Sequence, residues 1–219
     1  MEPDRQPLGV LVAFGDPLRM AREGIAGLLV GRGLRAGGCS DAISEVAHRV
    51  ARDAIDVVVV APFHALIAAS RDGGTSLSRI GQIRAAAPAA AVIVLAPFAH
   101  RQLVQAAMGQ GATGFPLMSD GVDVLEPAVY AVAGGATWFS PGLGGMVGGV
   151  DAGDDRPLDA RDIDLLLLTA RGLTNSEIAR VLQRSLRSIE GDRARFAADF
   201  GLESRADWVA EATARGLVG

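Results

Sequence analysis

Arginine carries the side-chain chemistry that stands out in this chain. The sequence contains 21 basic residues, and every one is an arginine. Schiff-base chemistry and the lysine-bearing phosphate loop are therefore excluded, because both need a lysine amine. A GC-rich coding sequence produces the same bias, so codon usage, and not function, is the simpler explanation for it. Four of the arginines gather in one segment near the C-terminus: Arg184, Arg187, Arg193 and Arg195.

Other residue types give little sign of catalysis or metal binding. Cys39 is the only cysteine, so the chain can form no internal disulfide, which fits a reducing cytoplasm. His48, His64 and His100 lie far apart in sequence and have no further ligands at metal-binding spacing. A G-x-G-x-x-G segment at 109–114 precedes a strand pattern instead of following one, the reverse of a dinucleotide site. We therefore expect no enzymatic activity, no cofactor and no metal.

The composition is that of a globular protein with one or two domains: 219 residues, of which 49% are hydrophobic and 21% charged. The net charge of -4 provides no global attraction to DNA or to an anionic membrane, so DNA binding would need a local patch. The N-terminus lacks a signal-peptide pattern, and the longest apolar stretch, 85–99, is too short to span a bilayer. We expect a cytoplasmic protein without a membrane partner.

Short apolar runs alternate with helical patterns along the first 134 residues. The runs at 10–14, 56–61, 91–96 and 114–118, with a fainter one at 34–39, are apolar on both faces. Helical periodicity occupies 22–30, 43–52, 77–87, 101–109 and 122–132. This alternation predicts a doubly wound α/β domain, in which helices cover both faces of a five-stranded parallel sheet.

The rest of the chain predicts a linker followed by an all-α unit. Residues 141–157 are too rich in glycine for a helix or strand interior and read as a flexible linker. Asp159 then caps a first helix, and either Thr174 or Asn175 opens a second. Ser185 opens a third helix that ends near residue 200, and a fourth spans about 206–214. Four helices with a tight connection between the second and third predict a helix-turn-helix domain.

Segments spread along the chain carry a resemblance to a known family. They are 22–25, 111–115, 135–141, 158–162 and, most clearly, 172–182 with the sequence GLTNSEIARVL. Together they resemble a response regulator of the NarL/FixJ type, which joins a flavodoxin-like receiver domain to a LuxR-type helix-turn-helix domain. The resemblance implies a receiver domain at 1–140, a linker at 141–157 and a DNA-binding domain at 158–219.

The residues that would carry phosphorylation depart from the family pattern. A working receiver has two carboxylates after strand 1 and a phosphorylated aspartate after strand 3, and together they hold Mg²⁺. It also has a hydroxyl after strand 4 and a lysine after strand 5. The resemblance places Phe14, Gly15, Ala61, Ala96 and Met118 at these positions. It therefore implies a degenerate receiver that takes up no phosphoryl group, because an alanine methyl cannot be a nucleophile.

Two alternatives stay open at this pocket. A shift of one residue would bring Asp16 into the acidic pair, although no aspartate would then replace Ala61. The apolar residues at the strand ends could simply fill the core, or they could admit a small-molecule ligand.

The third helix of the C-terminal unit also departs from the family. Where the family has a lysine and a histidine facing DNA, this sequence has Glu190 and Asp192, and carboxylates repel phosphates. Glu190 could instead read a base, since a carboxylate accepts from cytosine N4. The candidate DNA contacts are Arg184, Arg187, Ser188, Glu190, Asp192, Arg193 and Arg195.

The resemblance and its departures imply a phosphorylation-independent bacterial transcription regulator. We expect control by dimerisation, with itself or with a related regulator, or by a partner or ligand. By resemblance to receiver dimers, the segment 122–132 and the segment before it are candidate dimer surfaces. The alternative is an interaction partner or antagonist of another regulator that no longer binds DNA.

Overall fold

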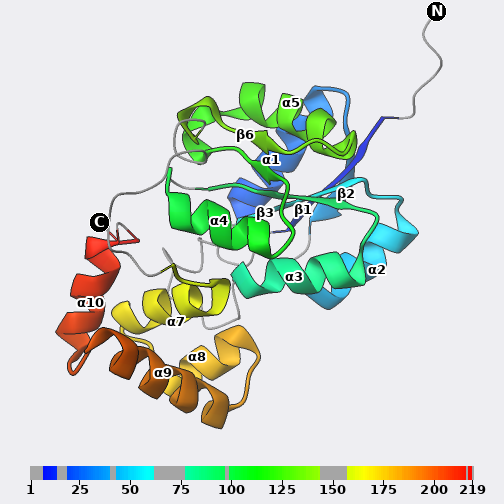
Figure 1. Ribbon diagram of the computed structural model, residues 1–219. Coiled ribbons are helices and arrows are strands. Elements are labelled where there is room, and N and C mark those ends of the chain that lie inside the picture. Colours follow the sequence, from blue (N-terminus) through cyan, green and yellow to red (C-terminus); the bar gives the residue numbers. More distant parts are fainter. Residues whose placement is uncertain are drawn as a thin grey trace, which may run out of the picture.

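The structure is a computed structural model that describes residues 7–13, 19–39, 43–61, 77–96, 99–143, 157–215 and 217–218. Residues 7–143, called the α/β half, form one parallel sheet covered by helices (Figure 1). The strands lie in the order β2-β1-β3-β4-β5-β6. They are β1 (Gly9–Ala13), β2 (Arg35–Cys39), β3 (Val57–Val60), β4 (Ala91–Val94), β5 (Gly114–Phe115) and β6 (Trp138–Phe139).

Alternate strand residues face opposite sides of this sheet. The described helices of this half are α1 (Arg19–Gly31), α2 (Ile43–Arg52), α3 (Leu77–Ala86), α4 (Arg101–Gly109), α5 (Val122–Ala133) and the short 3₁₀ helices η2 (Met118–Asp120) and η3 (Pro141–Leu143). Val10 and Val57 pack toward α1 and α5, whereas Leu11 and Val58 pack toward α2, α3 and α4. Apolar residues therefore occupy both faces of the central strands, as predicted for a doubly wound sheet.

The described sheet has six strands instead of the predicted five. The additional strand, β6, pairs in parallel with β5 through Gly114↔Trp138 and Phe115↔Phe139. Only two residues long, it lies at the edge of the sheet and gives no apolar run, so the sequence pattern misses it. The faint strand at 34–39 is confirmed as β2, an edge strand whose glycines weaken its apolar pattern.

Residues 157–218, called the helical half, contain four α-helices among the described residues, as the sequence predicts: α7 (Ala160–Ala170), α8 (Asn175–Leu182), α9 (Leu186–Phe200) and α10 (Arg205–Ala214). Asp159 caps α7 by accepting from the N–H groups of Arg161 and Asp162, each at 2.8 Å. Thr174, and not Asn175, caps α8, and Ser185 caps α9. Most of the predicted linker, 144–156, lies outside the described residues.

Helix α7 joins the two halves. Its residues 163–170 are all buried, including Leu165–Leu168, because it packs against α3 and α4 on one side and against α8, α9 and α10 on the other (Figure 1). A helix that is buried around its whole circumference needs such surroundings. One cluster of buried side chains therefore continues from the α/β half into the helical half.

Candidate nucleic-acid interface and strand-end pocket

The strand-end residues predicted from the sequence lie at the carboxyl edge of the sheet. Ala61 and Ala96 follow β3 and β4, and each is 2% exposed. Met118 follows β5 and is half-buried, and its N–H donates to the Ala96 carbonyl at 2.7 Å. The structure thus brings Ala96 and Met118 together as neighbours. Phe14, Gly15 and Asp16 lie outside the described residues.

Two described carboxylates near these strands have other roles. Asp56 lies at the opposite, amino end of β3, where it accepts from the Gly9 N–H at 2.7 Å. Asp120, the last residue of η2, accepts from the N–H of Leu117, the residue before η2, at 3.0 Å. Within the described ranges, no group of three His, Cys, Asp or Glu residues could hold a metal ion. In the same residues, no helix has both the length and the apolar content to cross a membrane.

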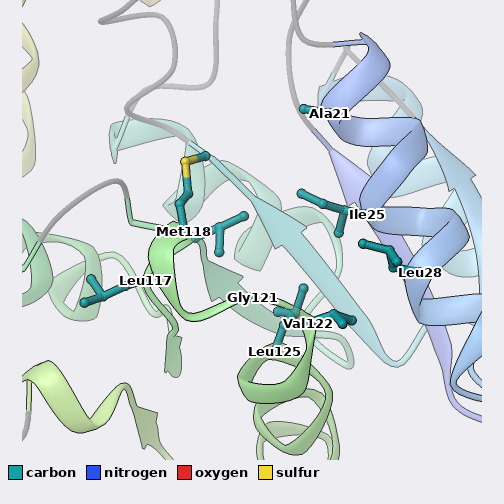
Figure 2. Close-up of a pocket in the computed structure, with 9 residues that line it drawn as sticks. Ala21, Ile25, Leu28, Leu117, Met118, Gly121, Val122 and Leu125 are labelled. Carbon is teal, nitrogen blue, oxygen red and sulfur yellow. The ribbon is translucent and has the colours of Figure 1, made fainter.

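An apolar cavity of about 330 Å³ adjoins this edge of the sheet. Ile25 and Leu28 of α1 project toward the side where Met118 and Val122 lie (Figure 2). The remaining residues that line the cavity are Ala21, Leu95, Leu117, Gly121 and Leu125. Met118 therefore lines the cavity, whereas Ala61 and Ala96 lie in the buried core. This volume falls in the range of small-molecule sites.

The turn before α9 fixes the position of that helix. Thr174 and Glu177 form a reciprocal capping box at the start of α8, in which the Glu177 carboxylate accepts from the Thr174 N–H at 2.8 Å. Helix α8 ends at Leu182, and the next residue, Gln183, has a left-handed backbone (φ 53°). Ser185 caps α9 two residues later. Ile189 and Phe196 anchor α9 in the core, so its opposite face is open to solvent.

Two of the predicted DNA-contacting arginines form ion pairs within the chain. Arg184 is 2.5 Å from Asp192 and also donates to the Ser188 hydroxyl. Arg195 is 2.5 Å from Asp162, and this hydrogen bond raises the pKa of Arg195. Paired charges attract phosphates less than free ones, because each carboxylate offsets part of the guanidinium field.

Arg193 points toward the interior of the helical half. Its guanidinium donates to the side-chain oxygen of Asn175 at 2.7 Å and lies 5.4 Å from the centre of the Trp208 ring. Trp208 in turn stacks on Phe196, with ring centres 5.1 Å apart. Arg193 therefore links α8, α9 and α10, an arrangement that contributes to stability through cation–π attraction.

Arg187 and Glu190 occupy the open face of α9. Both side chains are exposed, and neither forms an ion pair within the described residues. They are three residues apart, so they lie on the same side of the helix. Within the described residues, a cation and an anion thus face solvent together here, which gives this face of α9 little net charge.

Comparisons with known proteins agree with this architecture. The transcriptional regulatory protein MctR of Rhizobium johnstonii is 32% identical over 133 residues, 60% of this chain and 62% of that protein. This chain thus spans less than two thirds of the length of that curated relative. The response regulator RcsB of Salmonella typhimurium matches with a TM-score of 0.72 at 18% identity, covering 96% of this chain and 98% of RcsB. The chain has the fold of the response regulator RcsB.

A further RcsB structure, from Salmonella enterica serovar Typhimurium, was solved on the promoter rprA in the presence of the phosphomimetic BeF3-. It matches with a TM-score of 0.61 at 18% identity, over 94% of this chain and 98% of the other. No family model matches the sequence. The predicted fold, a receiver-like sheet with a helix-turn-helix unit, is therefore confirmed, while the loss of phosphorylation stays a prediction.

This RcsB-like fold also contains a contact between its halves that the sequence did not indicate. Asp164 of α7 is 7% exposed and accepts from the N–H groups of Leu77 and Ser78, at 3.0 and 3.1 Å, and from the Ser78 hydroxyl at 2.9 Å. A carboxylate from one half thus caps the first turn of α3 in the other. An aspartate inside a leucine-rich segment was the available signal, because a buried carboxylate needs partners.

His100 forms a second contact between the halves. Its Nδ1 accepts from the Leu103 N–H at 3.4 Å and caps α4. The hydrogen-bond pattern places the ring hydrogen on Nε2, which donates to the backbone carbonyl of Arg215 after α10. The start of α4, shortly after Ala96, is thereby linked to the end of the chain.

Proposed function

We propose that this chain is a cytoplasmic bacterial transcription regulator, without enzymatic activity, that binds DNA through α9. The exposed amino-terminal face of α9, with Arg187 free to reach a phosphate, carries the proposal. The fold shared with RcsB, which has been solved on promoter DNA, supports it. In this proposal residues 1–140 form a receiver domain, 141–157 a linker and 158–219 the DNA-binding domain.

Retention of genomic DNA fragments at low and moderate salt tests this function. Retention of particular fragments that falls steeply with salt would support it, since phosphate contacts release counterions. A shuffled fragment of equal length and base composition serves as the control. Equal or absent retention of all fragments at both salt concentrations would contradict sequence-specific DNA binding.

Control without phosphorylation is part of the proposal. Alanines occupy the positions of the family's phosphoacceptor and hydroxyl, and Met118 occupies that of its lysine. Each replacement removes a nucleophile, a hydrogen-bond donor or a charge that phosphoryl transfer needs. Another signal must then regulate the chain.

Dimerisation is one such means of control. Helices α1 and α5 lie side by side, joined by ion pairs from Arg32 to Asp123 and to Glu126. Leu28 of α1 and Tyr130 of α5 are 55% and 48% exposed, so both are accessible to a partner. A second copy, or a related regulator, would cover them. A monomeric mass by light scattering at all micromolar concentrations, with and without DNA, would contradict a homodimer.

An uncharged small molecule in the apolar cavity is the second means of control. Binding of the neutral dye Nile red tests whether the cavity admits such a ligand. Ile25→Trp should fill the cavity and reduce dye binding several-fold, whereas Met20→Trp, at an exposed position on the same helix, should not. Equal dye binding by both variants would place the dye elsewhere.

The alternative function is an interaction partner or antagonist that does not bind DNA. The observation in its favour is that Arg184, Arg193 and Arg195 all have partners within the chain, while Glu190 faces solvent. The DNA-retention experiment separates the two functions.

A further inference from the structure

A second cavity, of about 410 Å³, lies between the two halves and is called the inter-half cleft. Gln82 of α3 and Gln110 at the end of α4 line one side. Arg161 of α7, with Gln183 and Arg184 of the turn before α9, lines the other. The cleft therefore opens beside the turn that positions the candidate DNA-binding helix.

Among the described residues that line the cleft, the charged side chains are Arg161 and Arg184, and Gln82, Gln110 and Gln183 add three primary amides. The charge of Arg184 is partly offset by its ion pair with Asp192. Arg161 is exposed and forms no ion pair within the described residues. Arg184 uses two N–H groups on Asp192 and Ser188, but a guanidinium has five. Both arginines thus retain donors for an anion.

The walls of the cleft are fixed by contacts already described. Asp164 fastens α7 to the first turn of α3 and so sets the separation of the two sides. Gly81 leaves room for the Gln110 amide at the wall, because a Cβ at residue 81 would lie 2.7 Å from Gln110 Oε1. The donors are therefore held in place before any ligand arrives, which lowers the entropic cost of binding.

We propose that the inter-half cleft binds a small polar oxyanion, a metabolite that bears phosphate or carboxylate groups. Arg161 and Arg184 would pair with its negative oxygens, since guanidinium groups form strong charge-assisted hydrogen bonds with such anions. The amides of Gln82, Gln110 and Gln183 would donate to, or accept from, its remaining polar groups. A DNA duplex cannot enter a cavity of this size between packed helices.

Such a ligand touches both halves, so it stabilises their docked arrangement. It also occupies Arg184, which is one of the candidate DNA contacts, so the ligand and DNA compete for the same guanidinium. The ligand should therefore oppose DNA binding, and DNA should oppose the ligand by the same factor. This consequence, unlike binding itself, rests on the proposed DNA-binding function.

Calorimetric titration of the full chain with pyrophosphate tests the site without DNA. We expect saturable binding of one pyrophosphate per chain, in excess of any effect of chloride at equal ionic strength. Arg161→Gln and Arg184→Gln should each weaken it at least tenfold. Arg187→Gln, which removes an exposed arginine outside the cleft, should leave it unchanged. Equal affinity in all three variants, or an equal response to chloride, would overturn the proposal.

Circular dichroism and thermal unfolding show whether each variant is folded. Because Arg161 is exposed, its replacement should not disturb the core. In DNA retention at constant ionic strength, pyrophosphate should weaken binding by the unmodified chain several-fold but not by Arg161→Gln. An equal loss in both would contradict the coupling. A chain that binds pyrophosphate but no DNA would contradict the proposed function and leave the oxyanion site standing.

Discussion

Arg187 differs from the other candidate DNA-contacting arginines in having a free guanidinium on an open helix face. Arg187→Ala should weaken binding to all DNA sequences and reduce the salt dependence by about one unit, because one phosphate contact is lost. Arg193→Ala is the matched comparison. It should instead lower stability, since Arg193 packs against Trp208 and Asn175. Salt titrations of DNA affinity and thermal melts measure the two effects, and unchanged DNA affinity in Arg187→Ala would move the DNA surface elsewhere.

Substitution of Glu190 tests whether the carboxylate on this face of α9 is a lost phosphate contact or a group that reads a base. If Glu190 is simply a lost contact, Glu190→Lys should raise nonspecific DNA affinity, because a repelling charge becomes an attracting one. If it reads cytosine, the change should abolish sequence preference at a cost of about 1 to 3 kcal/mol. Competition between specific and random DNA distinguishes these results.

Adding Asp192→His to Glu190→Lys also releases Arg184 from its ion pair, so affinity should rise further. A double variant with unchanged affinity and unchanged preference would show that α9 does not meet DNA.

Ala61 leads to a prediction about phosphorylation. Incubation with acetyl phosphate and Mg²⁺ should leave the mass of the intact chain unchanged, because no carboxylate stands at the end of β3. A known phosphorylated receiver treated in parallel is the positive control. A stoichiometric, acid-labile gain of one phosphoryl group by this chain would refute the prediction.

At the residue scale, the sequence identified which side chains to inspect but not their partners. Arg193 and Arg187 are the same residue type in the same helix, yet Arg193 packs against Trp208 whereas Arg187 is exposed to solvent. Six positions along a helix amount to a rotation of about 600°, which places them on different faces. The partners of a side chain on either face come from α8 and α10, and the local sequence of α9 does not indicate how those helices pack against it.

At the scale of elements, long apolar runs and capping residues were the most informative signals. The central strands are valine-rich and apolar on both faces, so their burial could be predicted. β6 was missed because two residues cannot establish a period. The packing of α7 against α3 was also missed, although Leu165–Leu168 already covers more than one face of a helix.

Helix α9 contains an element-scale weakness at Gly191. A Cβ built there meets no atom within 4 Å, so Gly191→Ala should stabilise the chain by about 0.5 to 1 kcal/mol through lower backbone entropy in the unfolded state. Gly114→Ala is the opposing control. Its Cβ would lie 2.6 Å from Ile93 Cγ1, so it should destabilise. Denaturant unfolding measures both, and a less stable Gly191→Ala would contradict the prediction.

At the scale of the whole molecule, the two halves share a core and polar contacts although the sequence suggested separate domains. Asp164 and His100 each reach across the junction, as do the leucines of α7. Composition could indicate two folding patterns and a glycine-rich connection between them. It could not indicate their docking, because that depends on matching surfaces far apart in sequence.

The carboxylate of Asp164 protects two backbone amides of α3 from exchange with solvent. First-turn amides of a helix have no acceptor within their own helix, so they normally exchange rapidly with solvent deuterium. Here the amides of Leu77 and Ser78 depend on a carboxylate 87 and 86 residues away. Their exchange should therefore be slow, and Asp164→Asn should accelerate it about tenfold as one charged acceptor is lost. Asp159→Asn, which alters only the cap of α7 itself, should not.

Unaltered exchange in Asp164→Asn would show that the amides are protected by something else. Otherwise the exchange of these two amides reports on the junction. When reclosing is faster than exchange from the open state, the ratio of their rate to that of an unprotected amide gives the fraction of time that α7 spends away from α3 in the resting protein, before any DNA or ligand is added.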